Sequence, residues 1–251
     1  MRYRNIEVWG TVISIQSPAD NVIAEKFESA CDAAQDFYKS IDRTFSTYRN
    51  DSEVSRLRRQ EIAISDASPQ LKLVWNKCLE LRELTQRAFD PWAVAGGFDP
   101  SGLVKGWAAD AAADILVAAG VQHCQVNAAG DLALRGGWFD SAAGVVKPWS
   151  IGVVNPDNRA EIVKVFEITD GAIATSGTYE RGAHIHDPLN GLIAIGAKSA
   201  TVVGPEGWLC DAMATGVMVA GQDSAKWFGQ PELEGYQVFA VNRHEQTAWS
   251  I

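Results

Sequence analysis

One segment of the sequence, FDPSGLVKGWAADAAADILVAAGVQHCQVNAAGDLALRGG from Phe98 to Gly137, predicts a helix followed by a hairpin of two strands. We expect the helix to begin at Asp99, because its carboxylate can cap the first turn and Pro100 suits the first helical position. Gly120 is expected to end the helix, since glycine readily adopts the backbone conformation of a C-terminal cap.

The pattern within this segment also predicts which residues are buried. Residues 121–127 are expected to form a strand, 128–131 a tight turn and 132–134 a returning strand. Apolar residues recur every four positions in the helix, which predicts one buried face formed by Leu103, Trp107, Ala111, Ile115 and Ala119.

The length and composition are those of a globular protein with a substantial core. The chain has 251 residues, which suits a single domain over residues 1–251 or two intimately joined lobes. Of these residues 47% are hydrophobic and 21% are charged, which is ordinary for a folded soluble protein. The four cysteines are widely separated and form no CxxC pair, so we expect buried thiols rather than disulfides or a zinc site.

Charge and hydropathy exclude several classes of partner. The net charge of −9 argues against a protein that binds nucleic acid through its phosphates. No stretch approaches the roughly 18 consecutive apolar residues of a membrane helix, so we expect no membrane insertion. The first residues, MRYRNIEVWGTVISI, alternate like a strand and lack the apolar centre of a signal peptide, so we expect a cytoplasmic protein.

The start of the predicted helix is a candidate site for an anion. Small residues lead into a helix N-terminus beside Lys105, where free N–H groups and the helix dipole favour negative charge. The spacing matches neither GxGxxG nor GxxxxGK[ST], so neither a dinucleotide fold nor a P-loop is supported. These local features alone favour a capped helix with a solvated lysine over a ligand site.

Several ordered segments nevertheless resemble the FAD:protein FMN transferases, the ApbE-type flavin transferases. The segment DPSGLVKGWAAD resembles the family's D-x-x-G-x-[AV]-K-G-[YW]-x-x-D, and QVNAAGDLALRG resembles the V-N-x-G-G-D segment that follows it. Ala129 stands where the family usually has glycine. The resemblance extends from about Val8 to Gly221, and it implies an α+β fold, with helices packed on a mixed, mainly antiparallel sheet.

The N-terminal part of the chain predicts a strand over Val8–Ile15, interrupted at Gly10 and Thr11, and helices over Asn21–Ile41 and Pro69–Phe89. In the family, an M-G-T segment lines the flavin pocket at the position of Trp9, which replaces the methionine in this chain. The resemblance makes Trp9 a candidate for binding the flavin.

The segment FSTYRNDSEVSRLRR resembles the family's F-S-x-[YF]-x-x-x-S-x-[LV]-x-x-[LF]-N, with Arg58 in place of the asparagine. A tyrosine in such a loop is more often packed than functional, but the resemblance implies that Tyr48 lies against the flavin or the adenine. The segment that joins the predicted helix Pro69–Phe89 to the helix after Asp99 also matches a family segment that touches the cofactor. The matching residues are Ala88, Phe89 and Asp90.

The segment GAIATSGTYERGAHIHDPLNG resembles the family's [AV]-[ILV]-A-T-S-G-x-[YW]-x-R…H-x-[IL]-D-P-x-[TN]-G. A single histidine is usually structural, but His184 precedes a tight turn and follows Ser176 closely, which suits an accessible acid or base. His184 matches the family pattern, whereas His186 stands where the pattern has an aliphatic residue.

The segment SATVVGPEGWLCDAMATGVMVAG predicts a strand over 201–203 and a helix over 206–219. Asp211 and Thr215 lie one helical turn apart, so their oxygens project from one face and could hold half of a Mg²⁺ site. Spacing alone favours an ordinary helix, with the threonine bonded to its own backbone. The resemblance implies a metal segment, D-[AG]-[LMW]-[AS]-T-[AG], with the Gly102 carbonyl as third protein ligand.

The resemblance implies transfer of FMN from FAD to a threonine or serine hydroxyl of an acceptor protein, with release of AMP. His184 would be the base, and Asp211, Thr215 and Gly102 would hold Mg²⁺. The implied cofactor-binding residues are Trp9, Tyr48, Ala88, Phe89, Asp90, Asp99, Lys105, Ser176 and His186. Two alternatives stay open at this point: an Mg-dependent FAD pyrophosphatase that yields FMN and AMP, and a non-catalytic flavin-binding protein.

Overall fold

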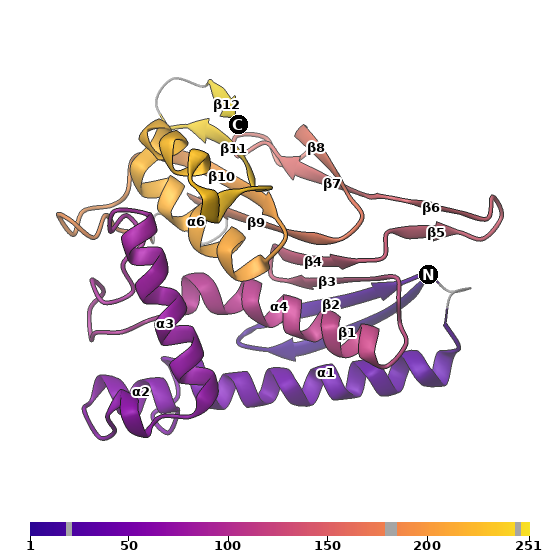
Figure 1. The fold of residues 1–251 in the computed structure, drawn as a ribbon, viewed down its shortest axis with the longest axis horizontal. Coiled ribbons are helices and arrows are strands. Elements are labelled where there is room, and N and C mark those ends of the chain that lie inside the picture. The colour runs from indigo at the N-terminus through magenta and orange to yellow at the C-terminus, as the bar shows by residue number, and fades with distance from the viewer. Residues whose placement is uncertain (19–21, 179–184, 244–246) are drawn as a thin grey trace.

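The largest element of the computed structural model, which describes residues 1–18, 22–178, 185–243 and 247–251, is an antiparallel sheet of eight strands (Figure 1). Their order is β1 (Arg2–Val8), β2 (Thr11–Ser17), β3 (Cys124–Ala128), β4 (Asp131–Arg135), β9 (Gly171–Gly177), β10 (Ala197–Gly204), β11 (Gln237–Asn242) and β12 (Ala248–Ser250). Two hairpins lie outside this sheet, namely β5 (Trp138–Asp140) with β6 (Val145–Lys147), and β7 (Trp149–Val154) with β8 (Ile162–Ile168). The predicted α+β class with a mainly antiparallel sheet is confirmed.

Three helices pack along the sheet. Helix α1 (Ala24–Phe45) contacts β1, α4 (Ser101–Ala118) contacts β3 and β4, and α6 (Gly207–Ala220) contacts β9 and β10. Helix α3 (Pro69–Leu84) lies across their ends and contacts all three (Figure 1). Shorter helices complete the described chain: α2 (Glu53–Arg58), η2 (Ile64–Asp66), η3 (Gly221–Gly229) and η4 (Pro231–Leu233).

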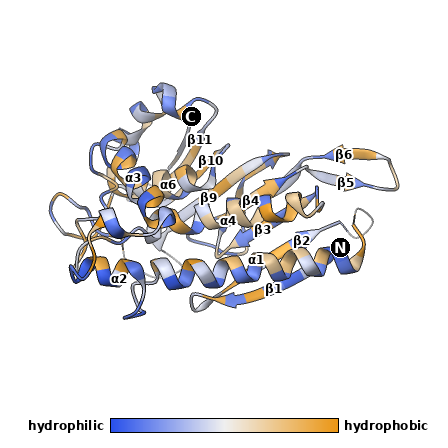
Figure 2. Ribbon diagram, turned by 60° about the horizontal axis from the view of Figure 1, so that its bottom comes forward, coloured by the Kyte–Doolittle hydropathy of each residue, from blue (hydrophilic) through white to orange (hydrophobic). Residues whose placement is uncertain are grey.

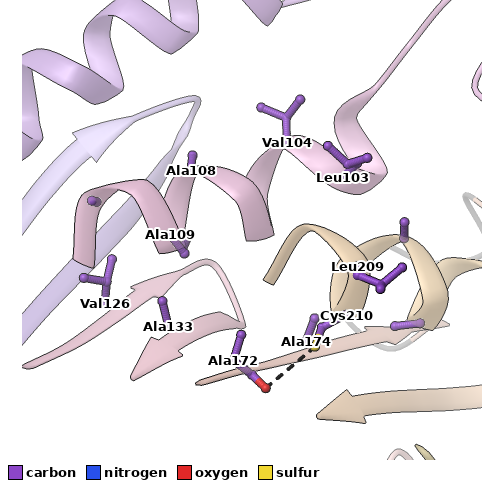
Figure 3. Packing of buried hydrophobic residues seen from close by; sticks show 14 of the residues in the cluster. Leu103, Val104, Ala108, Ala109, Val126, Ala133, Ala172, Ala174, Leu209 and Cys210 are labelled. Atoms are coloured by element: carbon purple, nitrogen blue, oxygen red, sulfur yellow. Dashed lines mark hydrogen bonds between the residues drawn. The ribbon is translucent and has the colours of Figure 1, made fainter. Parts of the chain in front are cut away.

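The sheet buries different side chains on its two faces, because successive residues of a strand point to opposite sides. Small residues face α4 and α6 and let these helices approach closely; Figure 3 shows Val126, Ala133, Ala172 and Ala174 beneath them. A second, smaller core cluster joins the large residues of the sheet to hairpin β7–β8 and contains Leu134, Trp149, Val153, Phe166, Ile168, Ile173 and Phe239.

The buried face of α4 differs from the predicted one. Trp107, Ala111, Ile115 and Ala119 are only half-buried, while the most buried positions are Leu103, Val104, Gly106, Ala108, Ala109, Ala112, Ala113 and Leu116. The reason is that α1, α6 and the sheet contact α4 on several sides. Small residues that allow close approach therefore decide its packing, and not a single apolar face of large residues. Figure 2 shows the outcome: α1 carries hydrophilic residues along its length, whereas α4 carries few.

The predicted strand over Val8–Ile15 is confirmed from Thr11 onward, where it belongs to β2, but its continuation back to Val8 is wrong. The chain reverses at Trp9 and Gly10, whose φ angles are 59° and 67°, and β1 pairs with β2 on either side of this turn. Two consecutive residues with positive φ match the twist of a tight hairpin, which the alternating pattern does not reveal. Trp9 therefore lies at the tip of a hairpin.

The predicted helices are confirmed, with different ends. Helix α3 stops at Leu84 rather than Phe89, because Gln86 and Arg87 adopt positive φ angles of 52° and 70°. Helix α4 begins at Ser101 with Pro100, not Asp99, at the cap position, and no side chain caps it, so the predicted cap is wrong. The Asp99 carboxylate instead accepts from the Ser101 N–H at 3.0 Å, in the turn that leads into the helix. All four cysteines are free and buried, as expected. No helix in the described ranges has both the length and the apolarity needed to cross a bilayer.

Candidate functional site

The candidate site lies where α4 and α6 cross at a pair of glycines. A Cβ atom on Gly106 would lie 2.1 Å from the carbonyl oxygen of Gly207, and a Cβ on Gly207 would lie 2.6 Å from the Gly106 oxygen. No larger residue fits without separating the helices. The two backbones therefore touch, and side chains from neighbouring turns of both helices meet.

Lys105 lies between two carboxylates next to this crossing. Its Nζ atom donates to Asp211 Oδ1 at 3.0 Å and to Oδ2 at 3.1 Å, and it also donates to Asp131 Oδ2. The Asp131 and Asp211 side chains are only 4% and 3% exposed, against 25% for Lys105. The backbone N–H of Gly106 donates to Asp211 Oδ2 at 3.2 Å and orients that carboxylate. One ammonium between two buried carboxylates leaves this cluster one negative charge in excess.

The pKa shifts agree with this charge balance. Burial, and then the neighbouring Asp211 carboxylate, hold the pKa of Asp131 well above its ordinary value, although Lys105 opposes the shift. Burial acts to lower the pKa of Lys105, but Asp131 and Asp211 outweigh it and raise that pKa. Lys105 therefore stays charged, and Asp131 takes up a proton more readily than an ordinary carboxylate does.

Two hydroxyl groups meet one turn of α6 away from Asp211. Thr215 Oγ1 is 3.3 Å from Ser176 Oγ, which belongs to β9. A Cβ on Gly102 would lie 3.4 Å from Thr215 Oγ1 and 3.2 Å from the ring of Phe89. The structure thus brings the predicted residue Gly102, on the first turn of α4, next to Thr215 on α6.

The residues present fit a hard divalent cation. A carboxylate, hydroxyls and a main-chain carbonyl are the oxygen donors that Mg²⁺ prefers, and Mg²⁺ takes its remaining ligands from water and substrate phosphates. The Lys105 ammonium touches both oxygens of Asp211 and so serves as a stand-in cation at this carboxylate. Within the described part of the chain, no three or more His, Cys, Asp or Glu residues converge as they would around a zinc ion.

The loop that follows α3 is buried beside this site. Ala88, Phe89 and Asp90 are 7%, 4% and 6% exposed. The Asp90 carboxylate accepts from Arg82 Nε at 2.9 Å, from both Arg87 Nε and Nη2, and from the backbone N–H of Trp92 at 3.1 Å. Asp90 therefore fixes the shape of the loop that holds Phe89 against Gly102. Cofactor binding by these three residues stays a prediction.

The other predicted binding residues lie outside the Lys105 cluster. Tyr48 is 97% exposed in the loop that follows α1, and Trp9 packs edge-on against Tyr38 with 5.3 Å between ring centroids. Asp99 accepts from the Ser101 N–H just before α4, and the exposed His186 forms an isolated bridge with Ile193. Nucleotide contacts for these residues stay predictions.

The predicted base, His184, lies outside the residues that the structure describes, together with Tyr179 and Arg181. Its position relative to the cluster is therefore a prediction from the family pattern.

Sequence reasoning did not single out Asp131. The residue matches the aspartate of the family's V-N-x-G-G-D segment, but it was given no role beyond the turn between two strands, where Asn127 Oδ1 accepts from the Gly130 N–H at 2.8 Å and Ala129 has a φ of 57°. That match is the signal that could have found Asp131. Its contact with Lys105 depends on how α4 packs against β4.

Asp110 matches the last position of the family's D-x-x-G-x-[AV]-K-G-[YW]-x-x-D, and it is a second residue to which the sequence assigned no role. Its Oδ2 accepts from the N–H of Gly207 at the start of α6, and its Oδ1 accepts from Arg135 Nη2 at 3.2 Å. Burial raises the pKa of Asp110 to about 6. Asp110 thus ties α4 to the first residue of α6.

A cavity of about 320 Å³ lies beside Arg135, the partner of Asp110. It is lined by Arg135, Asp170, Gly171 and Pro205.

Comparison with known proteins identifies relatives over most of the chain. The sequence profile described as the ApbE family matches residues 9–96 and 94–240. An FAD:protein FMN transferase of Vibrio cholerae is 27% identical, and the alignment covers 74% of this chain and 71% of that protein. The FAD:protein FMN transferase of Escherichia coli is 32% identical over 58% of this chain and 42% of its own length.

Solved structures share the fold over nearly the whole chain. The flavin transferase ApbE from Vibrio cholerae superimposes with a TM-score of 0.79 at 23% identity, covering 100% of this chain and 96% of that chain. The ApbE protein from Thermotoga maritima gives a TM-score of 0.82 at 22% identity, with coverages of 99% and 96%. The arrangement of sheet and helices described above is therefore that of these proteins.

Proposed function

We propose that this chain, which belongs to the ApbE family, is a magnesium-dependent FAD:protein FMN transferase. In this reaction FMN passes from FAD to a threonine or serine hydroxyl of an acceptor protein, and AMP is released. The names of the relatives support the reaction. The observation that carries the proposal is that both carboxylate oxygens of Asp211 contact a positive charge, the Lys105 ammonium. Thr215 lies one helical turn from Asp211 and adjoins Gly102.

Cleavage of the FAD pyrophosphate requires neutralisation of its negative charge. Asp211, Thr215 and the Gly102 carbonyl would hold Mg²⁺, which supplies this neutralisation when it is bound. The first turn of α4 adds the positive end of a helix dipole. Lys105 keeps its charge and adds a second positive group beside the phosphates.

The acceptor hydroxyl must lose its proton as it attacks phosphorus. We assign this step to His184, because an unperturbed imidazole titrates at a pKa of about 6.5 and is largely neutral at physiological pH. AMP leaves with the pyrophosphate oxygen, and FMN remains on the acceptor. The nucleotide would be held by Trp9, Tyr48, Ala88, Phe89, Asp90, Asp99, Ser176 and His186.

A combined assay of AMP release and covalent flavin tests the proposal. The protein is incubated with FAD, MgCl₂ and a lysate of its own source, AMP is measured by HPLC, and flavin fluorescence is recorded on a denaturing gel. We expect fluorescent protein bands and AMP with the wild type, and loss of both with Asp211→Asn. Asp157→Asn is the matched control, because it removes a carboxylate only from the exposed ion pair of Asp157 with Lys198. We expect it to leave the activity unchanged.

The same assay separates the alternative functions. Equal AMP release with and without the lysate would identify an FAD pyrophosphatase instead of a transferase. FAD binding without AMP or covalent flavin would identify a flavin-binding protein. The cytoplasmic location and the single domain expected from the sequence stay predictions.

A further inference from the structure

The Lys105 ammonium occupies the position that a metal ion needs at Asp211. It lies 3.0 Å and 3.1 Å from the two carboxylate oxygens, so it engages both of them. A bound Mg²⁺ lies about 2.1 Å from its oxygen ligands. A divalent ion on Asp211 and the ammonium in its present position would therefore be like charges in close contact, and the ammonium has to leave Asp211 first.

Asp131 offers the ammonium a second partner without a large movement. Lys105 Nζ already donates to Asp131 Oδ2, and the Asp131 side chain is only 4% exposed. A buried ammonium is costly unless it is paired, so an ammonium that leaves Asp211 needs this carboxylate. The Gly106 N–H, at 3.2 Å from Asp211 Oδ2, keeps the released carboxylate in its orientation.

We propose that Lys105 is an internal competitor of the divalent cation at Asp211, and that Asp131 receives the ammonium when the cation binds. This inference rests on the magnesium site of the proposed function and adds a role for two residues that do not ligate the metal. Asp131 is thus a positioning residue, which acts on the metal site through Lys105. Together the two residues set how tightly the site binds a divalent ion before any nucleotide arrives.

Binding of Mn²⁺ tests this inference without any flavin reaction. The free Mn²⁺ signal in electron paramagnetic resonance is titrated with the full chain, in the absence of FAD. Lys105→Met is expected to bind Mn²⁺ at least fivefold more tightly than the wild type, because the competitor is gone, and Asp131→Asn about fivefold more weakly, because the ammonium stays on Asp211. Lys147→Met removes an exposed lysine of the β5–β6 hairpin and should leave the affinity unchanged.

The double variant Lys105→Met with Asp131→Asn distinguishes competition from simple electrostatics. Two fixed charges would change the affinity by independent factors, so Asp131→Asn would weaken binding about fivefold in both backgrounds. Competition predicts that the Asp131→Asn effect falls below about twofold once Lys105 is absent. Equal factors in the two backgrounds would overturn the inference. If circular dichroism shows Lys105→Met to be unfolded, Lys105→Gln, which keeps N–H donors beside the carboxylates, replaces it in the same cycle.

Asp211→Asn separates this inference from the proposed function. If Asp211→Asn loses Mn²⁺ binding but Asp131→Asn weakens binding equally with and without Lys105, the metal site stands and only the competition by Lys105 is refuted. Unchanged Mn²⁺ binding in Asp211→Asn would refute the metal site, and the competition with it.

Discussion

Replacing Gly106 with alanine tests whether contact between the backbones of α4 and α6 builds the site. The added Cβ atom would lie 2.1 Å from the Gly207 carbonyl oxygen, 2.6 Å from the Gly207 carbonyl carbon and 2.9 Å from Asp211 Cβ. Carbon and oxygen atoms in ordinary contact lie roughly 3.4 Å or more apart, so the helices must separate by about 1 Å. Backbone atoms cannot rotate away as the end of a flexible side chain can.

The expected loss of stability combines two opposing effects. Overpacking a tight core costs typically about 1–3 kcal/mol, and a contact this short with backbone belongs at the upper end. Alanine is favoured over glycine inside a helix by about 1 kcal/mol, which offsets part of that cost. We therefore expect Gly106→Ala to lower the free energy of unfolding by about 2 kcal/mol.

Urea denaturation of the wild type, Gly106→Ala and Gly229→Ala measures this loss. Gly229 is the matched control, because a Cβ there meets no atom within 4 Å and its φ is not positive. It should change the free energy of unfolding by no more than about 0.5 kcal/mol. A Gly106→Ala protein as stable as the wild type, or more stable, would show that helix propensity outweighs the contact and would refute the reasoning.

Three further predictions concern single positions. Ala129→Gly should raise the free energy of unfolding by about 0.5–1 kcal/mol in urea, because glycine relieves the strain of a φ of 57°; a loss would contradict this. Burial raises the pKa of Asp110 to about 6, so its contribution to stability is present at low pH and is lost as the pH rises through that value. Urea titrations at several pH values should therefore show the wild type losing stability relative to Asp110→Asn between about pH 4 and 6, and a constant difference would count against it. Mg²⁺ at about 100 times its dissociation constant should stabilise the wild type by about 2.7 kcal/mol, but not Asp211→Asn, in a thermal melt; equal stabilisation of both would place the ion elsewhere.

Local sequence features predicted most of the secondary structure. Helical periodicity identified α1, α3 and α6, and the small residues at 128–131 identified the turn between β3 and β4. These elements are predictable because periodicity and turn chemistry depend on residues close together in the chain. The hairpin at Trp9 and Gly10 was missed, because the sequence indicated an interruption at Gly10 but the alternation continues on both sides of it and does not reveal that the chain reverses.

The site was predictable only where its residues share one helix or one matched segment. Asp211 and Thr215 are one turn apart on α6, so spacing alone puts their oxygens on one face. The family resemblance added Gly102, and the structure puts that residue beside Thr215. The resemblance pointed to Lys105 as a nucleotide-binding residue but did not indicate its contacts with two carboxylates.

The sequence by itself determined most of the helices and strands, and which side chains can carry chemistry. Only the tertiary structure decided that Lys105 meets Asp131, 26 positions away, and Asp211, 106 positions away. The physical reason is that burial and pairing of charges depend on which segments the sheet and the glycine crossing bring together. No local pattern contains that information, because each of the three residues taken alone is compatible with an ordinary solvated charge.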